Sequence, residues 1–213
     1  MSEVLDSPGI TFIDHGNYLQ VRNPLFDEFV LDPQSDGPKA VLADVVKTPL
    51  GQRALDLTQL SKCQEHATIP RTNEFGRLGH ITVIGEIIDR LGRREKATAD
   101  KILAYVLYGC LSDLSHGPLS HATDIAVEGQ GQDERFHELR SPEALALGGV
   151  IEALKKRNIS TDERGNIPGI EIPRWVECDA PDICGDRLQY TLQEMLLWFT
   201  DSKTPEATTI KQT

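Results

Sequence analysis

Residues 97–117 carry the most regular pattern of apolar side chains in the chain, and this pattern predicts a helix with one buried face. Apolar residues recur there at intervals of three and four, which places them on one stripe of an α-helix. The stripe consists of Ile102, Leu103, Val106, Leu107, Cys110, Leu111 and Leu114. Asp113 and His116 fall near its C-terminal end, one turn apart, so we expect their side chains on the same side.

Other segments with helical spacing surround this one. In residues 39–60 the pattern is interrupted at Thr48-Pro49, and in residues 74–92 Gly92 is expected to end the helix. Residues 141–157 begin with a Ser cap and a Pro at the first helical position, and residues 185–199 are also expected to be helical. The segments together predict a mainly α domain.

The first 35 residues differ, because short apolar segments there read as extended chain with a turn at residues 15–17. We therefore expect an N-terminal β-hairpin region over residues 1–35 that packs on the domain. A helical domain over residues 36–200 and a polar tail over residues 201–213 complete the predicted organisation.

Composition and charge limit the classes of function. With 39% apolar and 26% charged residues the chain reads as a globular protein, and no apolar run approaches the roughly 20 residues of a membrane span. The acidic N-terminus lacks the pattern of a secretory signal, so we expect a cytoplasmic protein without a membrane partner. A net charge of −11 argues against a long nucleic acid as partner. It does not exclude a free nucleotide, whose phosphates a metal and a few arginines can neutralise.

Three residues from separate predicted helices form a candidate metal site: His80, Asp113 and Asp186. Each alone would more often be a core histidine or a capping aspartate. Two carboxylates and an imidazole on different helices of a bundle are, however, a common way to hold a hard or borderline divalent cation. Such an ion would support phosphoryl chemistry.

Proton transfer and phosphate binding need further groups near such an ion. His116, His121 and His137 are candidates for general acid/base work, and Asp124 could orient one of them. For phosphate oxygens the candidates are Arg77, one turn before His80, and Arg187, directly after Asp186. Tyr190 and Glu194 follow Asp186 at helical spacing on one face and would suit a sugar.

The arrangement resembles the HD-domain phosphohydrolases, specifically the deoxynucleoside triphosphate triphosphohydrolase branch. The family's HDxGHGPxSH stretch corresponds to "SDLSHGPLSH" at residues 112–121, and its RxxH corresponds to Arg77–His80. The TPxxQRLxxLxQL segment corresponds to "TPLGQRALDLTQL" at residues 48–60, a His-Glu pair to His137-Glu138, and the closing D-[KR]-x-x-Y motif to "DRLQY". The motifs keep the family's order over residues 10–195, nearly the whole chain.

The resemblance implies an HD-domain helical bundle that hydrolyses a dNTP to a deoxynucleoside and triphosphate. The metal would be of the Mn or Fe type, or Mg, and its ligands would be His80, Asp113 and Asp186. His116, His121, Asp124 and His137 would act around the α-phosphate, and Arg77 and Arg187 would hold phosphates. Gln59 and Tyr190 would contact the nucleoside, with Glu194 nearby. Other phosphate esters and a homo-oligomeric assembly are also compatible with the resemblance.

Two positions depart from the family pattern. Ser112 replaces the histidine that supplies a fourth metal ligand, and Gln189 replaces the usual Asp before Tyr190. The retained histidines favour an active, metal-dependent phosphohydrolase, whereas Ser112 favours the alternative, a degenerate HD domain that binds a nucleotide or a protein without turnover. A purely structural helical domain would require the ordered motifs to be accidental.

Overall fold

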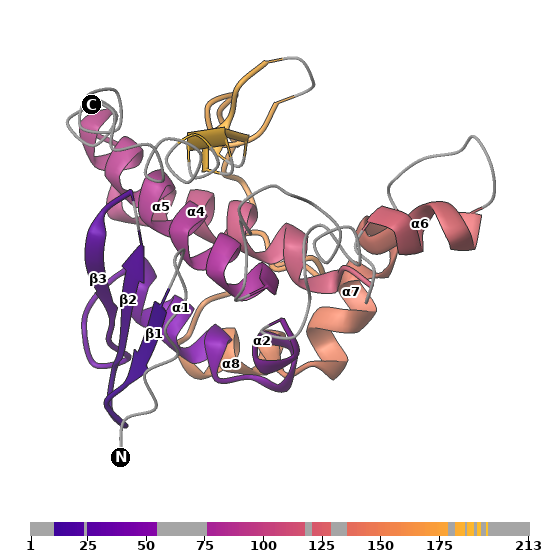
Figure 1. Ribbon diagram of the computed structural model, residues 1–213, viewed down its shortest axis with the longest axis horizontal. Helices are drawn as coiled ribbons and strands as arrows, with labels where there is room; N and C mark the ends of the chain where they lie inside the picture. The colour runs from indigo at the N-terminus through magenta and orange to yellow at the C-terminus, as the bar shows by residue number, and fades with distance from the viewer. Residues whose placement is uncertain are drawn as a thin grey trace.

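The protein is described by a computed structural model in which a small sheet is followed by helices (Figure 1). The structure describes residues 11–23, 25–54, 76–117, 121–128, 136–178, 182–185, 187–189, 191, 192 and 195. The expected mainly α fold with a short N-terminal β element is confirmed. Among the described helices, none is both long and apolar enough to span a bilayer. The predicted boundaries after residues 35 and 200 stay a prediction.

The N-terminal sheet consists of β1 (Thr11–Asp14), β2 (Leu19–Asn23) and β3 (Asp27–Leu31), antiparallel and in sequence order. The predicted turn between the first two strands is confirmed by a hydrogen bond from the His15 N–H to the Tyr18 carbonyl at 3.0 Å. Side chains alternate between the two faces, and the apolar face enters the same core as α1 (Pro38–Val46). The sheet therefore covers one side of the helices.

The centre of the core is formed by α4 (Gly76–Arg94) and α5 (Ala99–Leu111), which lie side by side (Figure 1). Their facing side chains are fully buried, as the periodicity predicts. Thr98 caps α5, because its hydroxyl accepts the Lys101 N–H. The stretch with Asp113 follows α5 directly and stays packed on the core through Leu114, which is fully buried.

The prediction that the helix expected over residues 74–92 ends at Gly92 is wrong. α4 continues to Arg94, and the chain leaves it at Lys96, which has a positive φ of 56°. The Ala97 N–H donates to the Gly92 carbonyl at 2.9 Å, a C-terminal motif in which the left-handed residue is usually glycine. Gly92 is needed elsewhere: a Cβ there would lie 2.8 Å from Ile102 of α5. The glycine permits close packing of two helices and is not a helix stop.

The prediction that a helix starts at Ser141-Pro142 is also wrong. α7 (Phe136–Leu147) begins five residues earlier and contains Pro142 in its interior, and α8 (Val150–Lys156) follows after a break. The cap is supplied by a distant residue, since the His137 N–H in the first turn donates to the Asp124 carboxylate at 3.2 Å. A cap from another helix leaves no local sequence signal.

The interruption predicted at Thr48-Pro49 is confirmed. α1 ends at Val46, and α2 (Pro49–Arg53) begins with Thr48 as its cap, whose hydroxyl accepts the Gly51 N–H at 3.1 Å. The last predicted helix is supported where the chain is described, because those residues between 185 and 195 have helical backbone.

Candidate metal and acid/base centre

α5 passes at Leu111 into a short 3-10 helix, η1 (Ser112–Ser115), which positions the first two site residues. A 3-10 helix has three residues per turn, so residues three apart lie on the same edge. Accordingly Asp113 Oδ1 lies 3.4 Å from Nδ1 of His116, the residue that follows η1. The prediction that these two side chains share one side is confirmed.

His80 reaches Asp113 from the buried face of α4. Its Nε2 lies 3.1 Å from Asp113 Oδ2, and the imidazole is 1% exposed. The two oxygens of Asp113 therefore face two imidazoles that come from different elements. The two residues are 33 positions apart in the sequence.

A second pair lies beside the first and joins α6 (His121–Glu128) to α7. The buried carboxylate of Asp124 accepts from the His137 ring, with 2.8 Å between Oδ2 and Nδ1, and its Oδ1 accepts from the His137 backbone N–H. The ring bond orients the imidazole, and the backbone bond holds the start of α7 on Asp124. Because a carboxylate accepts, the ring bond also places the proton on Nδ1, which leaves Nε2 of a neutral His137 with its lone pair.

The two pairs meet through their histidines. The rings of His116 and His137 stack with centroids 3.6 Å apart and planes 25° from parallel. Donor atoms of Asp113, His116 and His137 all lie within 4.8 Å of one another. The structure thus brings five predicted site residues, His80, Asp113, His116, Asp124 and His137, into one buried or half-buried cluster. We call these five residues the His/Asp cluster.

Gln189 was noted in the sequence only as a departure from a family motif, and its role in the site was missed. It is fully buried, and its amide oxygen hydrogen-bonds Nδ1 of His80. An amide oxygen can only accept, so Nδ1 carries the proton and the lone pair of a neutral His80 lies on Nε2. The sequence did contain an indication of this role: Gln189 is a polar residue on the predicted helix of Asp186, at the position where the family has an Asp.

The donor set of the cluster fits a divalent cation. In the neutral ring, His80 Nε2 directs its lone pair toward Asp113 Oδ2 over 3.1 Å. Two electron-rich atoms at this distance are stabilised by a positive charge that both can contact. Mixed imidazole and carboxylate donors suit first-row divalent ions. The Nδ1–H groups of His80 and His137 donate to oxygens of Gln189 and Asp124, an arrangement that is typical of imidazoles that bind a metal through Nε2.

Arg53, at the end of α2, is a further cation at this site that the sequence did not single out. Its Nη2 donates to the backbone carbonyl of His116 at 3.0 Å. The bond ties α2 to the end of η1, next to the cluster. Arg53 belongs to the "TPLGQR" motif, so the motif itself was the available signal.

Of the remaining predicted site residues, the structure describes the side chain of Arg187 alone. Arg187 donates through Nη1 to the carbonyls of Cys178 (2.9 Å) and Asp182 (2.7 Å), so it holds a loop. Arg77 and His121 lie in the first turns of α4 and α6, and their side chains lie outside the described part of the structure. The positions outside it altogether are Gln59, Asp186, Tyr190 and Glu194. The roles of all these residues stay predictions.

Comparison with known proteins adds two distant relatives. The chain is 33% identical over 89 residues to the uncharacterized protein YdhJ of Bacillus subtilis, which covers 41% of this chain and 26% of that protein. It is 28% identical over 181 residues to the metal-dependent phosphohydrolase cns2 of Cordyceps militaris, which covers 84% of this chain and 45% of that protein. No family model matches the chain. The chain spans less than half the length of either relative.

Proposed function

We propose that this chain is a metal-dependent phosphohydrolase of the HD-domain class that acts on a nucleotide, with a dNTP triphosphohydrolase reaction as the specific form. The observation that carries the proposal is the His/Asp cluster, in which side chains from α4, η1, α6 and α7 converge. The ordered motifs and the name of the relative cns2 support the same class.

In this proposal His80, Asp113 and Asp186 hold a divalent ion of the Mn or Fe type, or Mg. Such an ion supplies Lewis-acid activation of water and of the phosphoryl group. Gln189 orients His80, and the carboxylate of Asp113 is shared between His80 and His116. The described donors also include an overlapping set, Asp113, His116 and His137, so Asp113 is common to both.

The acid/base part of the proposal uses the second pair. Asp124 holds the proton of His137 on Nδ1, so Nε2 can accept a proton from water. His116 stacks on that ring, and His121 would protonate the leaving oxygen. Arg77 and Arg187 would bind phosphates, and Gln59, Tyr190 and Glu194 would contact the nucleoside. In the specific reaction water adds to the α-phosphorus, the bond to the 5′ oxygen breaks, and triphosphate and a deoxynucleoside leave.

The test combines metal content with product analysis. The purified chain is expected to contain Mn or Fe by elemental analysis and to release triphosphate from a panel of dNTPs. Asp113→Ala should lose both metal and turnover, whereas Asp100→Ala, an exposed aspartate in the first turn of α5, should lose neither. His80→Ala and His137→Ala separate the two donor sets, because only the variant that removes a ligand should lose metal.

Other results would redirect the assignment. Release of single phosphates would retain the phosphohydrolase and reject the triphosphohydrolase form. Nucleotide binding without turnover at saturating Mn²⁺ would leave the degenerate, nucleotide-binding domain in its place. Ser112, which lacks an imidazole, is the observation that favours this second candidate.

A further inference from the structure

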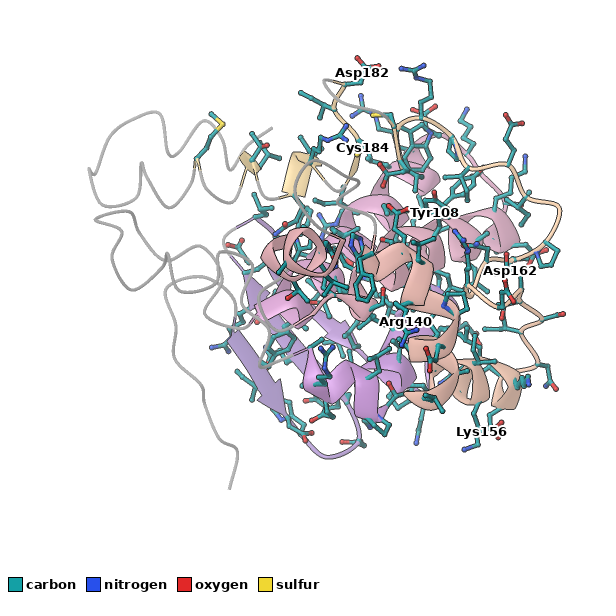
Figure 2. All side chains as sticks on the ribbon, turned by 90° about the vertical axis from the view of Figure 1, so that its right-hand side faces the viewer. Tyr108, Arg140, Lys156, Asp162, Asp182 and Cys184 are labelled. Atoms are coloured by element: carbon teal, nitrogen blue, oxygen red, sulfur yellow. The ribbon has the colours of Figure 1, made fainter. Side chains whose placement is uncertain are left out.

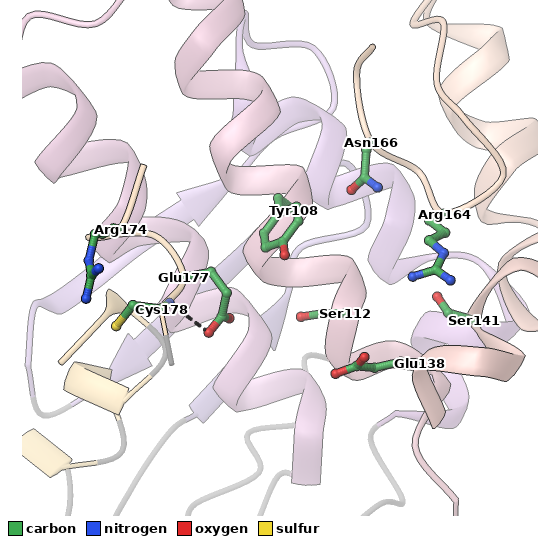
Figure 3. A pocket seen from close by; sticks show the side chains of 9 residues that line it. All are labelled: Tyr108, Ser112, Glu138, Ser141, Arg164, Asn166, Arg174, Glu177 and Cys178. Carbon is green, nitrogen blue, oxygen red and sulfur yellow. Dashed lines mark hydrogen bonds between the residues drawn. The ribbon is translucent and has the colours of Figure 1, made fainter. Parts of the chain in front are cut away.

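A pocket of about 540 Å³ lies next to the His/Asp cluster and contains none of its residues (Figure 3). Its lining is Tyr108, Ser112, Glu138, Ser141, Arg164, Asn166, Arg174, Glu177 and Cys178. Two of these are chain neighbours of cluster residues, since Ser112 precedes Asp113 and Glu138 follows His137. Consecutive Cα atoms are about 3.8 Å apart, so pocket and cluster share two stretches of backbone. We call this cavity the Ser112 pocket.

Two helices form the inner walls. Tyr108 on α5 and Ser112, the first residue of η1, are four residues apart, and Glu138 and Ser141 are three apart on α7, so each pair presents one face. The small Ser112 side chain turns its hydroxyl to the Gly109 carbonyl at 3.3 Å. Figure 3 shows the side chains of Ser112 and Glu138 pointing into the same space.

The outer wall is a tight turn held by Asp162. Its carboxylate accepts the backbone N–H groups of Arg164 and Asn166, both at 2.9 Å, and the Asn166 side chain at 3.1 Å. Between them Gly165 has a φ of +81°, and a Cβ there would lie 2.4 Å from Leu111. The turn is therefore docked on the end of α5 and presents Arg164 and Asn166 beside Ser112. In Figure 2 the turn that contains Asp162 lies at the edge of the molecule, farther out than Tyr108.

The last wall is the segment that carries Glu177. It is anchored on α5 because the Trp175 ring packs edge-on against Tyr105, with centroids 5.4 Å apart. The Trp175 carbonyl accepts the Gly185 N–H at 2.8 Å, and Glu177 Oε1 accepts the Cys178 N–H at 3.0 Å. Every wall of the pocket is thus fixed by packing or hydrogen bonds in the described chain. A site preformed in this way loses little entropy on binding.

The lining is polar and mixed in charge. Its acceptors are the carboxylates of Glu138 and Glu177, and its donors include the guanidinium of Arg164 and the amide of Asn166. Burial raises the pKa of the Tyr108 hydroxyl, Glu177 and Glu138 raise it further, and Arg164 opposes them. These charges therefore surround the Tyr108 hydroxyl. The lining carries two carboxylates, of Glu138 and Glu177, and two guanidinium groups, of Arg164 and Arg174, so it has no excess positive charge to attract a phosphate. A lining without aliphatic side chains does not favour an apolar group either.

We propose that the Ser112 pocket binds the uncharged, hydroxyl-bearing part of the phosphate-ester substrate, such as the sugar of a nucleotide, while the phosphate lies on the cluster. The inference rests on the proposed function and adds a substrate site to it. Each sugar hydroxyl both donates and accepts, which matches a lining that combines carboxylates with guanidinium and amide groups. The volume lies within the range of roughly 300–1,000 Å³ that is usual for small-molecule sites.

The test measures binding of dephosphorylated probes, so it does not depend on turnover. Deoxyguanosine and ribose are titrated into the full chain, without added metal, by calorimetry. Both are expected to bind, and Glu138→Gln and Glu177→Gln should each weaken binding by about tenfold, the usual effect of a lost hydrogen bond to a charged group. Glu143→Gln is the matched control, because Glu143 lies on α7 in an ion pair with Arg140 and does not line the pocket. Circular dichroism verifies that each variant is folded.

Hydrolysis supplies the second readout. Glu138→Gln should raise KM for a nucleotide and leave KM for p-nitrophenyl phosphate, which has no hydroxyl groups, unchanged. If neither probe binds, or if the three Glu→Gln variants bind equally, the Ser112 pocket is not a substrate site, even when hydrolysis persists. If probes bind and respond to the variants but no phosphate ester is hydrolysed, the pocket stands and the proposed function fails.

Discussion

Replacement of Asp124 by asparagine should separate proton transfer from metal binding at this site. Asp124 is fully buried and accepts from His137 twice, at Nδ1 (2.8 Å) and at the backbone N–H (3.2 Å). Asparagine has one acceptor oxygen. If that oxygen keeps the backbone N–H, the amide NH₂ faces Nδ1 and the ring proton moves to Nε2. His137 could then no longer accept a proton there.

The structure sets the expected size of both effects. The bond from Nδ1–H to a buried carboxylate is replaced by one between neutral groups, which should lower the free energy of unfolding by no more than about 1.5–3 kcal/mol, the usual contribution of a hydrogen bond to a charged group. Loss of a positioned general base should reduce the rate of hydrolysis by roughly 10²–10⁴-fold. Metal content should remain unchanged, because in the proposed assignment His137 is not a ligand.

The assay compares Asp124→Asn with Asp89→Asn, which makes the same chemical change at another buried carboxylate. Asp89 accepts from Arg93 at 3.0 Å and lies away from the cluster, so this control should lose stability and keep its rate. Phosphate release at saturating Mn²⁺, elemental analysis and urea unfolding are measured for both. An unchanged rate in Asp124→Asn would refute the reasoning. A fall in metal content would instead identify His137 as a ligand.

Three further changes give distinct expectations. Ser112→His should tighten Mn²⁺ binding at least several-fold in a metal titration and, because imidazole is larger than a hydroxyl, weaken deoxyguanosine binding in the Ser112 pocket. Gln189→Leu removes the acceptor for His80 Nδ1 and should weaken metal affinity by roughly 10–100-fold. Gln189→Glu keeps an acceptor oxygen and should not weaken it; equal metal affinities of the two variants would reject the orienting role of Gln189. Burial and the charge of Asp113 raise the pKa of the Cys110 thiol, so the unfolded chain ionises first and stability should fall as pH rises above about 8.5. Urea unfolding should show a smaller decline from about pH 7.5 to 9.5 in Cys110→Ala.

The local sequence predicted those parts of the fold that depend on neighbours within one helical turn. The apolar stripe of α5, the cap at Thr48 and the shared side of Asp113 and His116 all follow from spacings of three or four residues. Helix ends were predicted less well. At Gly92 the need for close packing against Ile102 overrides the usual meaning of glycine, and α7 begins where Asp124 of another helix caps it.

The residue types of the site were available from the sequence, and their partners were not. The motifs named His80, Asp113, His116 and His137, but which carboxylate oxygen meets which ring depends on how α4, η1 and α7 cross. Gln189 illustrates the reason: it contacts His80 from 109 positions away, and no local pattern encodes a contact at that separation. The Ser112 pocket has the same origin, since its walls come from α5, α7 and two later segments that only tertiary packing brings together.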